Sequence, residues 1–163
     1  MLKFIGRGSA FTKKQNSAFF SDGNDLVLVD HSMSSFHKLI KEGAANLTET
    51  GRADNIYVIV THTHSDHISG IPMLIHYAYY IMHTPVIVAA PSEEVMNDLL
   101  FYIDKLDGCD KKAYSIISTE KLKWVKATIP TEHTPALKGK CFGYLLEIHP
   151  DGEAARFWEE VSV

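Results

Sequence analysis

One stretch of the sequence is more informative than any other: Thr61-His62-Thr63-His64-Ser65-Asp66-His67. It begins at the end of a predicted strand at residues 55–61. In that strand, Ile56-Tyr57-Val58-Ile59-Val60 is an uninterrupted run of β-branched and aromatic residues typical of a buried strand. The histidines therefore lie where a loop leaves the carboxyl end of a strand, the edge at which α/β folds bind ligands. Imidazole and carboxylate groups are suitable ligands for Zn²⁺ and similar divalent ions. The stretch predicts a metal site.

The spacing within this stretch suggests two neighbouring ions. His62 and His64 are two positions apart in an extended loop, so both side chains can converge on one ion. Asp66 and His67 are adjacent and turn into a helix, so we expect them to point elsewhere and to hold a second ion. Two ions about 3.5–4 Å apart can generate hydroxide and clamp a displaced oxyanion. The alternative interpretation is a polar surface loop that happens to be rich in histidine.

The composition is that of an ordinary soluble domain, and we expect one domain over residues 1–163. A chain of this length can remove roughly 70% of its unfolded surface from water. The net charge of −4, without a block of like charges, gives no basic footprint for nucleic acid. Cys109 and Cys141 are too far apart for a disulfide framework or a cysteine zinc knuckle. Since no apolar run approaches the ~20 residues of a membrane helix, we expect a cytoplasmic protein without a membrane partner.

The remaining sequence alternates between strand and helix patterns. We expect strands at 2–5, 17–20, 26–29, 55–61 and 85–90, helices at 34–42, 72–82 and 92–106, and then strands at 114–118, 122–129, 142–148 and 155–161. Units of strand, helix and strand followed by further strands predict an α/β fold. His76 and His83 lie on or just past the apolar second helix, and we interpret them as packed or capping histidines rather than ligands.

The histidine stretch resembles the signature of the metallo-β-lactamase superfamily. The longer pattern His62-x-His64-x-Asp66-His67-x-x-Gly70-x-Pro72-x-Leu74 is similar to that of the ribonuclease Z branch, as are residues 6–11 and 16–18. Residues 26–30 resemble the superfamily's strand ending in aspartate, although Ser32 stands where a glycine is common. The resemblance extends over residues 1–147. It implies the αββα sandwich of the superfamily, with its second half incomplete.

The resemblance also implies roles for residues outside the stretch. His133 precedes Phe142-Gly143-Tyr144 as the third histidine of the first metal site does in the ribonuclease Z branch. It would complete a site with His62 and His64, and a zinc ion with three protein ligands keeps a fourth position for water. Asp30 fits an acceptor that orients a ligating imidazole. His31, beside it, is a candidate to line the pocket.

The C-terminal part departs from the family pattern. The family has a further aspartate that bridges both metals and a histidine near the C-terminus, but no histidine follows His149 here. Glu160 stands near the place of the aspartate, and its longer side chain would displace the carboxylate. We therefore expect a chain truncated relative to the family. Its second metal would be held by Asp66 and His67 alone, and the arm that grips tRNA would be missing.

Taken together, the residues and the resemblance predict a metal-dependent hydrolase with one or two Zn²⁺ ions, or Mn²⁺ or Fe²⁺ in their place. The first expectation is a ribonuclease Z-like phosphodiesterase in which metal-activated water attacks RNA or a small phosphodiester and Asp66 orients the nucleophile. One alternative is a hydrolase of thioesters, lactones or small phosphoesters on the same fold. Another is a non-catalytic truncated relative, or a half-subunit that depends on a partner. A homodimer is a further possibility for the assembly of the chain.

Overall fold

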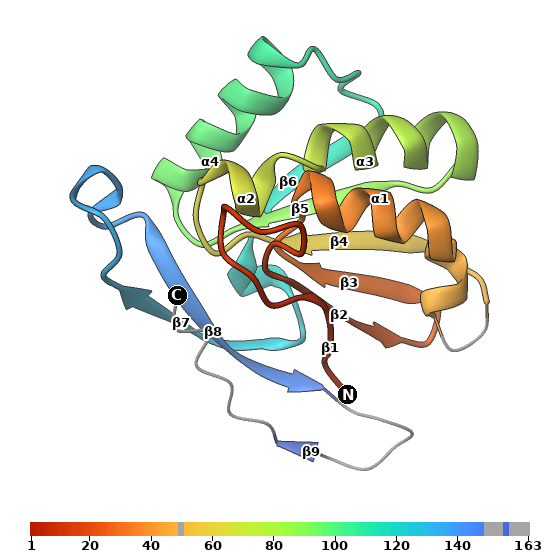
Figure 1. Cartoon of the computed structure of the whole chain (residues 1–163), viewed down its shortest axis with the longest axis horizontal. Helices are drawn as coiled ribbons and strands as arrows, with labels where there is room; N and C mark the ends of the chain where they lie inside the picture. Colours follow the sequence, from red (N-terminus) through yellow and green to blue (C-terminus); the bar gives the residue numbers. More distant parts are fainter. Residues whose placement is uncertain (49–50, 149–154, 157–163) are drawn as a thin grey trace.

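A six-stranded sheet forms the centre of the molecule, with its strands in the order β1-β2-β3-β4-β5-β6 (Figure 1). The computed structural model describes residues 1–48, 51–148 and 155–156. The strands of this sheet are β1 (Lys3–Gly6), β2 (Ser17–Asp22), β3 (Asp25–Val29), β4 (Asn55–Ile59), β5 (Val86–Ala90) and β6 (Tyr114–Ser118). The first three pair antiparallel, and β3 to β6 pair parallel. The carboxyl ends of the parallel strands therefore meet at one edge of the sheet.

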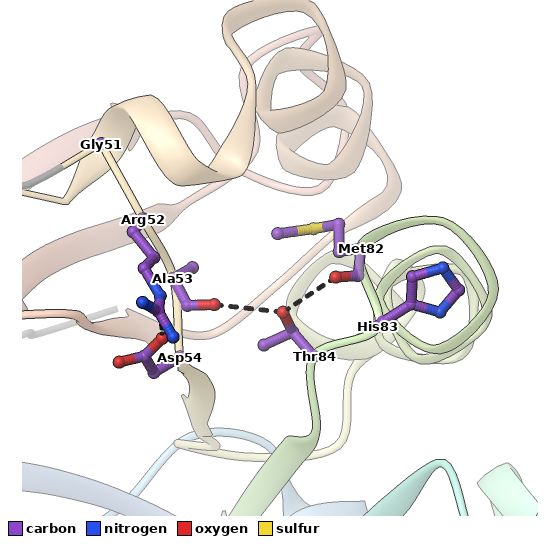
Figure 2. A pocket seen from close by; sticks show the side chains of 7 residues that line it. All are labelled: Gly51, Arg52, Ala53, Asp54, Met82, His83 and Thr84. Carbon is purple, nitrogen blue, oxygen red and sulfur yellow. Dashed lines mark hydrogen bonds and ion pairs between the residues drawn. The ribbon is translucent and has the colours of Figure 1, made fainter.

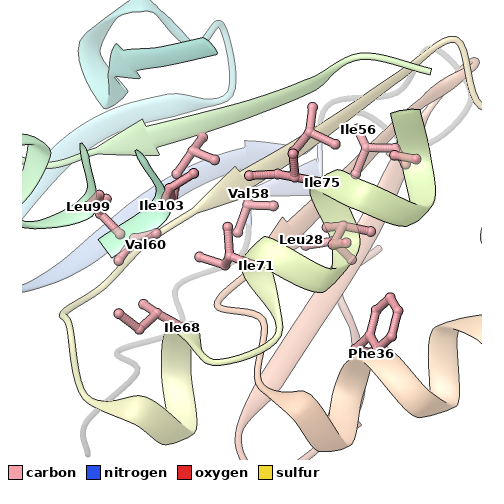
Figure 3. Packing of buried hydrophobic residues seen from close by; sticks show 14 of the residues in the cluster. Leu28, Phe36, Ile56, Val58, Val60, Ile68, Ile71, Ile75, Leu99 and Ile103 are labelled. Atoms are coloured by element: carbon pink, nitrogen blue, oxygen red, sulfur yellow. The ribbon is translucent and has the colours of Figure 1, made fainter. Parts of the chain in front are cut away.

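Helices cover one face of this sheet (Figure 1). They are α1 (Met33–Glu42), η1 (Ala44–Leu47), α2 (Ser65–Ile68), α3 (Ile71–Tyr77) with its π-helical continuation η2 (Ala78–Met82), and α4 (Glu93–Leu100) with its π-helical continuation η3 (Phe101–Leu106). Alternate strand residues face this layer, as side chains do on a pleated strand. Leu28 and Val58 pack there with Phe36, Ile71 and Ile75 (Figure 3).

A second sheet lies against the other face of the first. It consists of β7 (Val125–Thr131), β8 (Cys141–Ile148) and β9 (Ala155–Arg156), all antiparallel, and the short helices η4 (Thr119–Lys121) and η5 (Pro135–Leu137) flank β7. The strand residues of the first sheet that point away from the helices, such as Val27 and Ile59, pack against this second sheet. Phe20 meets Trp124 edge to face at 5.7 Å between ring centroids. The first sheet is thus buried on both faces, which explains its continuously apolar strands.

Two backbone-directed hydrogen bonds fix the second sheet to the end of β4. The Tyr144 hydroxyl donates to the carbonyl oxygen of Val60, and the Phe142 amide donates to the carbonyl oxygen of Thr61 at 3.0 Å. Both acceptors come directly before His62. The second sheet is therefore anchored at the very residues that lead into the histidine stretch.

The predicted α/β sandwich is confirmed, with three of its four layers present in the described residues. No helix covers the outer face of the second sheet in residues 1–48 and 51–148. The strand predicted at 155–161 is described only at 155–156. The strand predicted from 122 begins at Val125, because η4 and a turn occupy the residues before it. None of the described helices has the length and hydropathy that a membrane-spanning helix requires.

Gly70 lies where two chain segments approach too closely for a side chain. Its amide donates to the carbonyl oxygen of His31 at 2.9 Å, and the His31 amide donates to the carbonyl oxygen of His67 at 2.7 Å. A Cβ atom at position 70 would lie 2.3 Å from the carbonyl oxygen of Ser32. The glycine in the extended histidine motif thus permits the loop after β3 to pack against the segment that joins α2 and α3.

We expect Gly70→Ala to lower the free energy of unfolding by about 1–3 kcal/mol, because a backbone oxygen cannot move aside as a side chain can. Gly143→Ala is the matched control, since its Cβ would meet only Thr131 Cγ2 at 3.8 Å. That control should keep or slightly raise stability, because glycine weakens a strand. Urea unfolding curves measure both. Equal loss in the two variants would contradict the close-approach explanation.

Candidate metal centre

Three imidazoles from two different sheets meet at the carboxyl edge of the parallel strands. His62 and His64 follow β4, and His133 follows β7. Each offers a ring nitrogen, and these nitrogens all lie within 4.8 Å of one another. The ring centroids form a nearly equilateral triangle, with sides of 4.9 Å from His62 to His64, 4.9 Å from His62 to His133 and 4.8 Å from His64 to His133. Such an arrangement can hold one divalent ion.

The inner member of this triangle has a polar atom without a protein partner. His62 is 1% exposed, and its Nδ1 lies 3.0 Å from the Thr61 hydroxyl. Its Nε2 is buried and has no hydrogen-bond partner in the described residues. A buried polar atom is normally paired, because an unmade hydrogen bond costs free energy. The orphaned nitrogen therefore fits a bound metal ion.

The charge states of the rings also fit a metal ion. Burial is the main cause that lowers the pKa of His62 to about 4. The charge of the neighbouring His67 also lowers this pKa, and its effect is larger than that of His64 or His133. Burial followed by the charge of His133 lowers the pKa of His64. Metal ligation requires the neutral imidazole with a free lone pair. At neutral pH these two rings are already in that form.

The carboxylate of Asp30 organises the loop beneath the triangle. It accepts hydrogen bonds from the Thr61 amide at 2.8 Å, the Thr61 hydroxyl at 2.7 Å and His67 Nδ1 at 2.6 Å. Burial alone would lower the pKa of His67, but the hydrogen bond and charge of Asp30, together with the charge of Asp66, raise it above its ordinary value. A carboxylate behind an imidazole in this way fixes the tautomer and the ring direction.

His67 and Asp66 lie together beside the triangle. Asp66 is in the first turn of α2, and its Oδ2 is 3.5 Å from His67 Nε2, the nitrogen that Asp30 does not use. The His67 ring centroid is 3.9 Å from that of His62. Both residues are buried. The structure therefore brings all five predicted ligands to one edge of the sheet, with Asp66 and His67 as a separate pair.

The other candidate positions have different outcomes. His31 is completely buried, burial lowers its pKa to about 3, and the described contacts of its ring are with Ser35 and Phe36 of α1. Glu160 and His149 lie outside the described residues. Ser32 has an ordinary φ of −81°, so the turn after β3 forms without the glycine common at this place in the superfamily. Asp30 carries the left-handed conformation of this turn, with a φ of 55° that aspartate tolerates.

Thr61 is a site residue that sequence reasoning missed. Its hydroxyl connects the Asp30 carboxylate to His62 Nδ1, and its amide also binds Asp30. The only signal in the sequence is a β-branched hydroxyl residue immediately before the first histidine. Its importance follows from the position of Asp30 on the neighbouring strand, which the sequence near Thr61 does not contain.

A pocket elsewhere on the molecule is separate from this centre. It is lined by Gly51, Arg52, Ala53, Asp54, Met82, His83 and Thr84 (Figure 2). These residues precede β4 and β5, so the pocket lies at the amino ends of the strands, whereas the histidines follow their carboxyl ends. The Thr84 hydroxyl lies 3.1 Å from the carbonyl oxygen of Ala53 and closes part of its wall. None of the five predicted ligands lines it.

The sequence itself matches a known family. The profile of the family described as "Anti-Pycsar protein Apyc1" matches residues 1–146, which is most of the chain. The chain belongs to the anti-Pycsar protein Apyc1 family. No curated protein matches the chain.

The fold of this Apyc1 family member is similar to solved structures. A diphosphatase from the PhnP family matches with a TM-score of 0.60 and 18% identity, over 90% of this chain and 62% of that one. The human short form of tRNase Z matches with a TM-score of 0.48 and 18% identity, over 74% of this chain and 47% of that one. The chain thus spans about half to three fifths of the length of these proteins. The metallo-β-lactamase fold is confirmed, while the matching family is Apyc1 rather than ribonuclease Z.

We expect Asp30→Asn to lower the Zn²⁺ affinity of the histidine cluster by about 10–100-fold, because the amide cannot accept from Thr61 and His67 as the carboxylate does. Asparagine also tolerates the left-handed backbone at this position, so the turn should survive. Competition with a chromophoric chelator measures the affinity. Asp54→Asn, the same change at an exposed aspartate before β4, is the control. Unchanged affinity in Asp30→Asn would contradict an orienting role.

Proposed function

We propose that this protein is a metal-dependent phosphodiesterase that hydrolyses a cyclic nucleotide. The main support is the buried Nε2 of His62, which has no hydrogen-bond partner in the described residues and belongs to the triangle completed by His64 and His133. Membership of the anti-Pycsar family favours a cyclic nucleotide among phosphodiesters. The fold is shared with a diphosphatase, so hydrolysis at phosphorus is compatible with the scaffold.

The ligand set of the proposed site consists of nitrogen and carboxylate groups. His62, His64 and His133 would hold one ion, and Asp66 with His67 would contribute to a second. Three imidazoles with an open position suit Zn²⁺ best, and Mn²⁺ or Fe²⁺ are the alternatives. When bound there, such an ion would lower the pKa of water to about 7 and would so supply hydroxide at neutral pH.

The protein's own residues would orient the reactants. Asp66 offers a carboxylate that can accept a hydrogen bond from the attacking water and hold it in line with the phosphorus. Asp30 and Thr61 fix His67 and His62 through the contacts described above. His133 is exposed and His64 is partly exposed, so a phosphate can approach from this side. Hydrolysis forms one bond from water oxygen to phosphorus, breaks one ester bond, and the leaving oxygen takes up a proton.

We expect His64→Ala to lower kcat/KM for the best substrate by at least about 100-fold, because one of three ligands is lost. A panel of 3′,5′-cyclic nucleotides, with bis(p-nitrophenyl) phosphate as a generic diester, identifies that substrate by chromatography of the monophosphate product. His37→Ala is the control, since His37 is an exposed histidine of α1. An equal loss in both variants would argue against the assigned site.

Removal of the metal provides an independent prediction. Dialysis against a chelator should abolish hydrolysis of the diester, and Zn²⁺ or Mn²⁺ should restore it in the wild-type chain but not in His64→Ala. Full activity in metal-free protein, with metal content verified by elemental analysis, would exclude the proposed chemistry.

The small number of ligands near the second metal position favours a second candidate, a partner-dependent form of the protein. In residues 1–48 and 51–148, Asp66 and His67 are the two ligands near the second metal position, and two ligands hold an ion weakly. If the chain binds about one ion tightly but hydrolyses no diester, the non-catalytic or partner-dependent alternative is favoured. Turnover of thioesters or lactones without turnover of any phosphodiester would instead favour the other hydrolase class.

A further inference from the structure

A second group of metal-ligating side chains lies apart from the histidine triangle. It consists of His76 in α3 and of Asp107 and Cys109, which follow η3. Their ligand atoms all lie within 4.8 Å of one another, although 31 residues separate His76 from Asp107 and 33 separate it from Cys109. The interpretation of His76 as a merely packed or capping histidine therefore omits its two neighbours.

The distances in this group are those of one face of a tetrahedral site. His76 Nε2 is 2.9 Å from Asp107 Oδ2 and 3.6 Å from Cys109 Sγ, and Cys109 Sγ is 3.4 Å from Asp107 Oδ2. Tetrahedral zinc, with its usual bond lengths, requires about 3.3 Å between nitrogen and oxygen and about 3.6 Å from sulfur to either. The observed triangle needs to expand by only a few tenths of an ångström along the two sides that meet at Asp107 Oδ2.

The geometry argues against a catalytic cysteine. In a nucleophile–histidine–aspartate triad, the aspartate binds one ring nitrogen and the nucleophile faces the other. Here Asp107 and Cys109 both approach Nε2 of His76. Three ligand atoms that converge on one point are instead suited to a single central cation.

We propose that His76, Asp107 and Cys109 bind a transition-metal ion, with Zn²⁺ the ion best suited to a sulfur, nitrogen and oxygen ligand set. Cys109 is 3% exposed, whereas the side chains of His76 and Asp107 are 35% and 33% exposed. The sulfur thus lies on the inner side, and the fourth position opens to solvent, where water can occupy it. On binding, the thiol proton of Cys109 is released to solvent.

The ion would join two elements of the helical layer. His76 belongs to α3, and Asp107-Gly108-Cys109 forms the turn by which the chain leaves α4 and η3. Helices α3 and α4 cover the same face of the central sheet (Figure 1). Hydrogen bonds connect the three groups, and the Cys109 thiol can donate to Asp107 or, at 3.9 Å, to the Pro72 carbonyl oxygen. A structural ion would replace these weak contacts by coordinate bonds.

Titration of the untagged full chain with Co²⁺ tests this site directly. A cobalt–thiolate bond gives a charge-transfer absorption in the near ultraviolet that histidine and carboxylate ligands do not give. The five candidate ligands of the histidine centre include no cysteine, so the band reports on a cysteine outside that centre. We expect the band in the wild-type chain and in His64→Ala, which separates this proposal from the proposed function.

Matched variants assign the band to its ligands. Cys141→Ser, which removes the other buried cysteine, should keep it, and Cys109→Ser should lose it. Because a change at buried Cys109 can also disturb packing, His76→Gln is the second variant, with Cys109 retained and folding verified by circular dichroism. We expect its apparent Co²⁺ affinity to fall at least tenfold. No band in the wild-type chain, a band that persists in Cys109→Ser, or unchanged affinity in His76→Gln would each overturn the proposal.

Discussion

The carboxylate of Asp30 lies at the end of β3 and accepts hydrogen bonds from Thr61 and His67, which belong to the segment after β4. It therefore ties two neighbouring parallel strands together at the edge where the candidate ligands meet. Because Asp30 is buried, these hydrogen bonds are shielded from water and leave little freedom for the loop. The direction of His67 and, through the Thr61 hydroxyl, that of His62 both depend on this one group.

The second constraint is the attachment of the second sheet. Tyr144 and Phe142 of β8 donate to the carbonyl oxygens of Val60 and Thr61, immediately before the histidines. Since β7 pairs with β8 through most of its length, this attachment also fixes where β7 ends and where His133 lies. The third imidazole of the triangle thus comes from a sheet that is hydrogen-bonded to the backbone immediately before His62.

Burial gives the histidines of this edge different properties. Desolvation lowers the pKa of His62 to about 4, because the charge of Asp30 raises that pKa by less than burial lowers it. His67 is also buried, but Asp30 outweighs the desolvation and its pKa rises. The same residue type is therefore a neutral ring at one position and a carboxylate-oriented ring at the other. In the second cluster, by contrast with buried His62 and His67, the ring of His76 beside Asp107 is partly exposed.

The sequence by itself determined the six strands of the central sheet, the main helices and the four ligand candidates from His62 to His67, because strand patterning and the i, i+2 spacing are local. It indicated His133 only through a resemblance, since 69 residues separate it from His64. Only the tertiary structure decided that Thr61 bridges Asp30 and His62, that His31 packs against α1, and that His76 meets Asp107 and Cys109. These outcomes depend on how separate elements dock, and docking is set by the shapes of buried side chains over the whole core rather than by any local pattern.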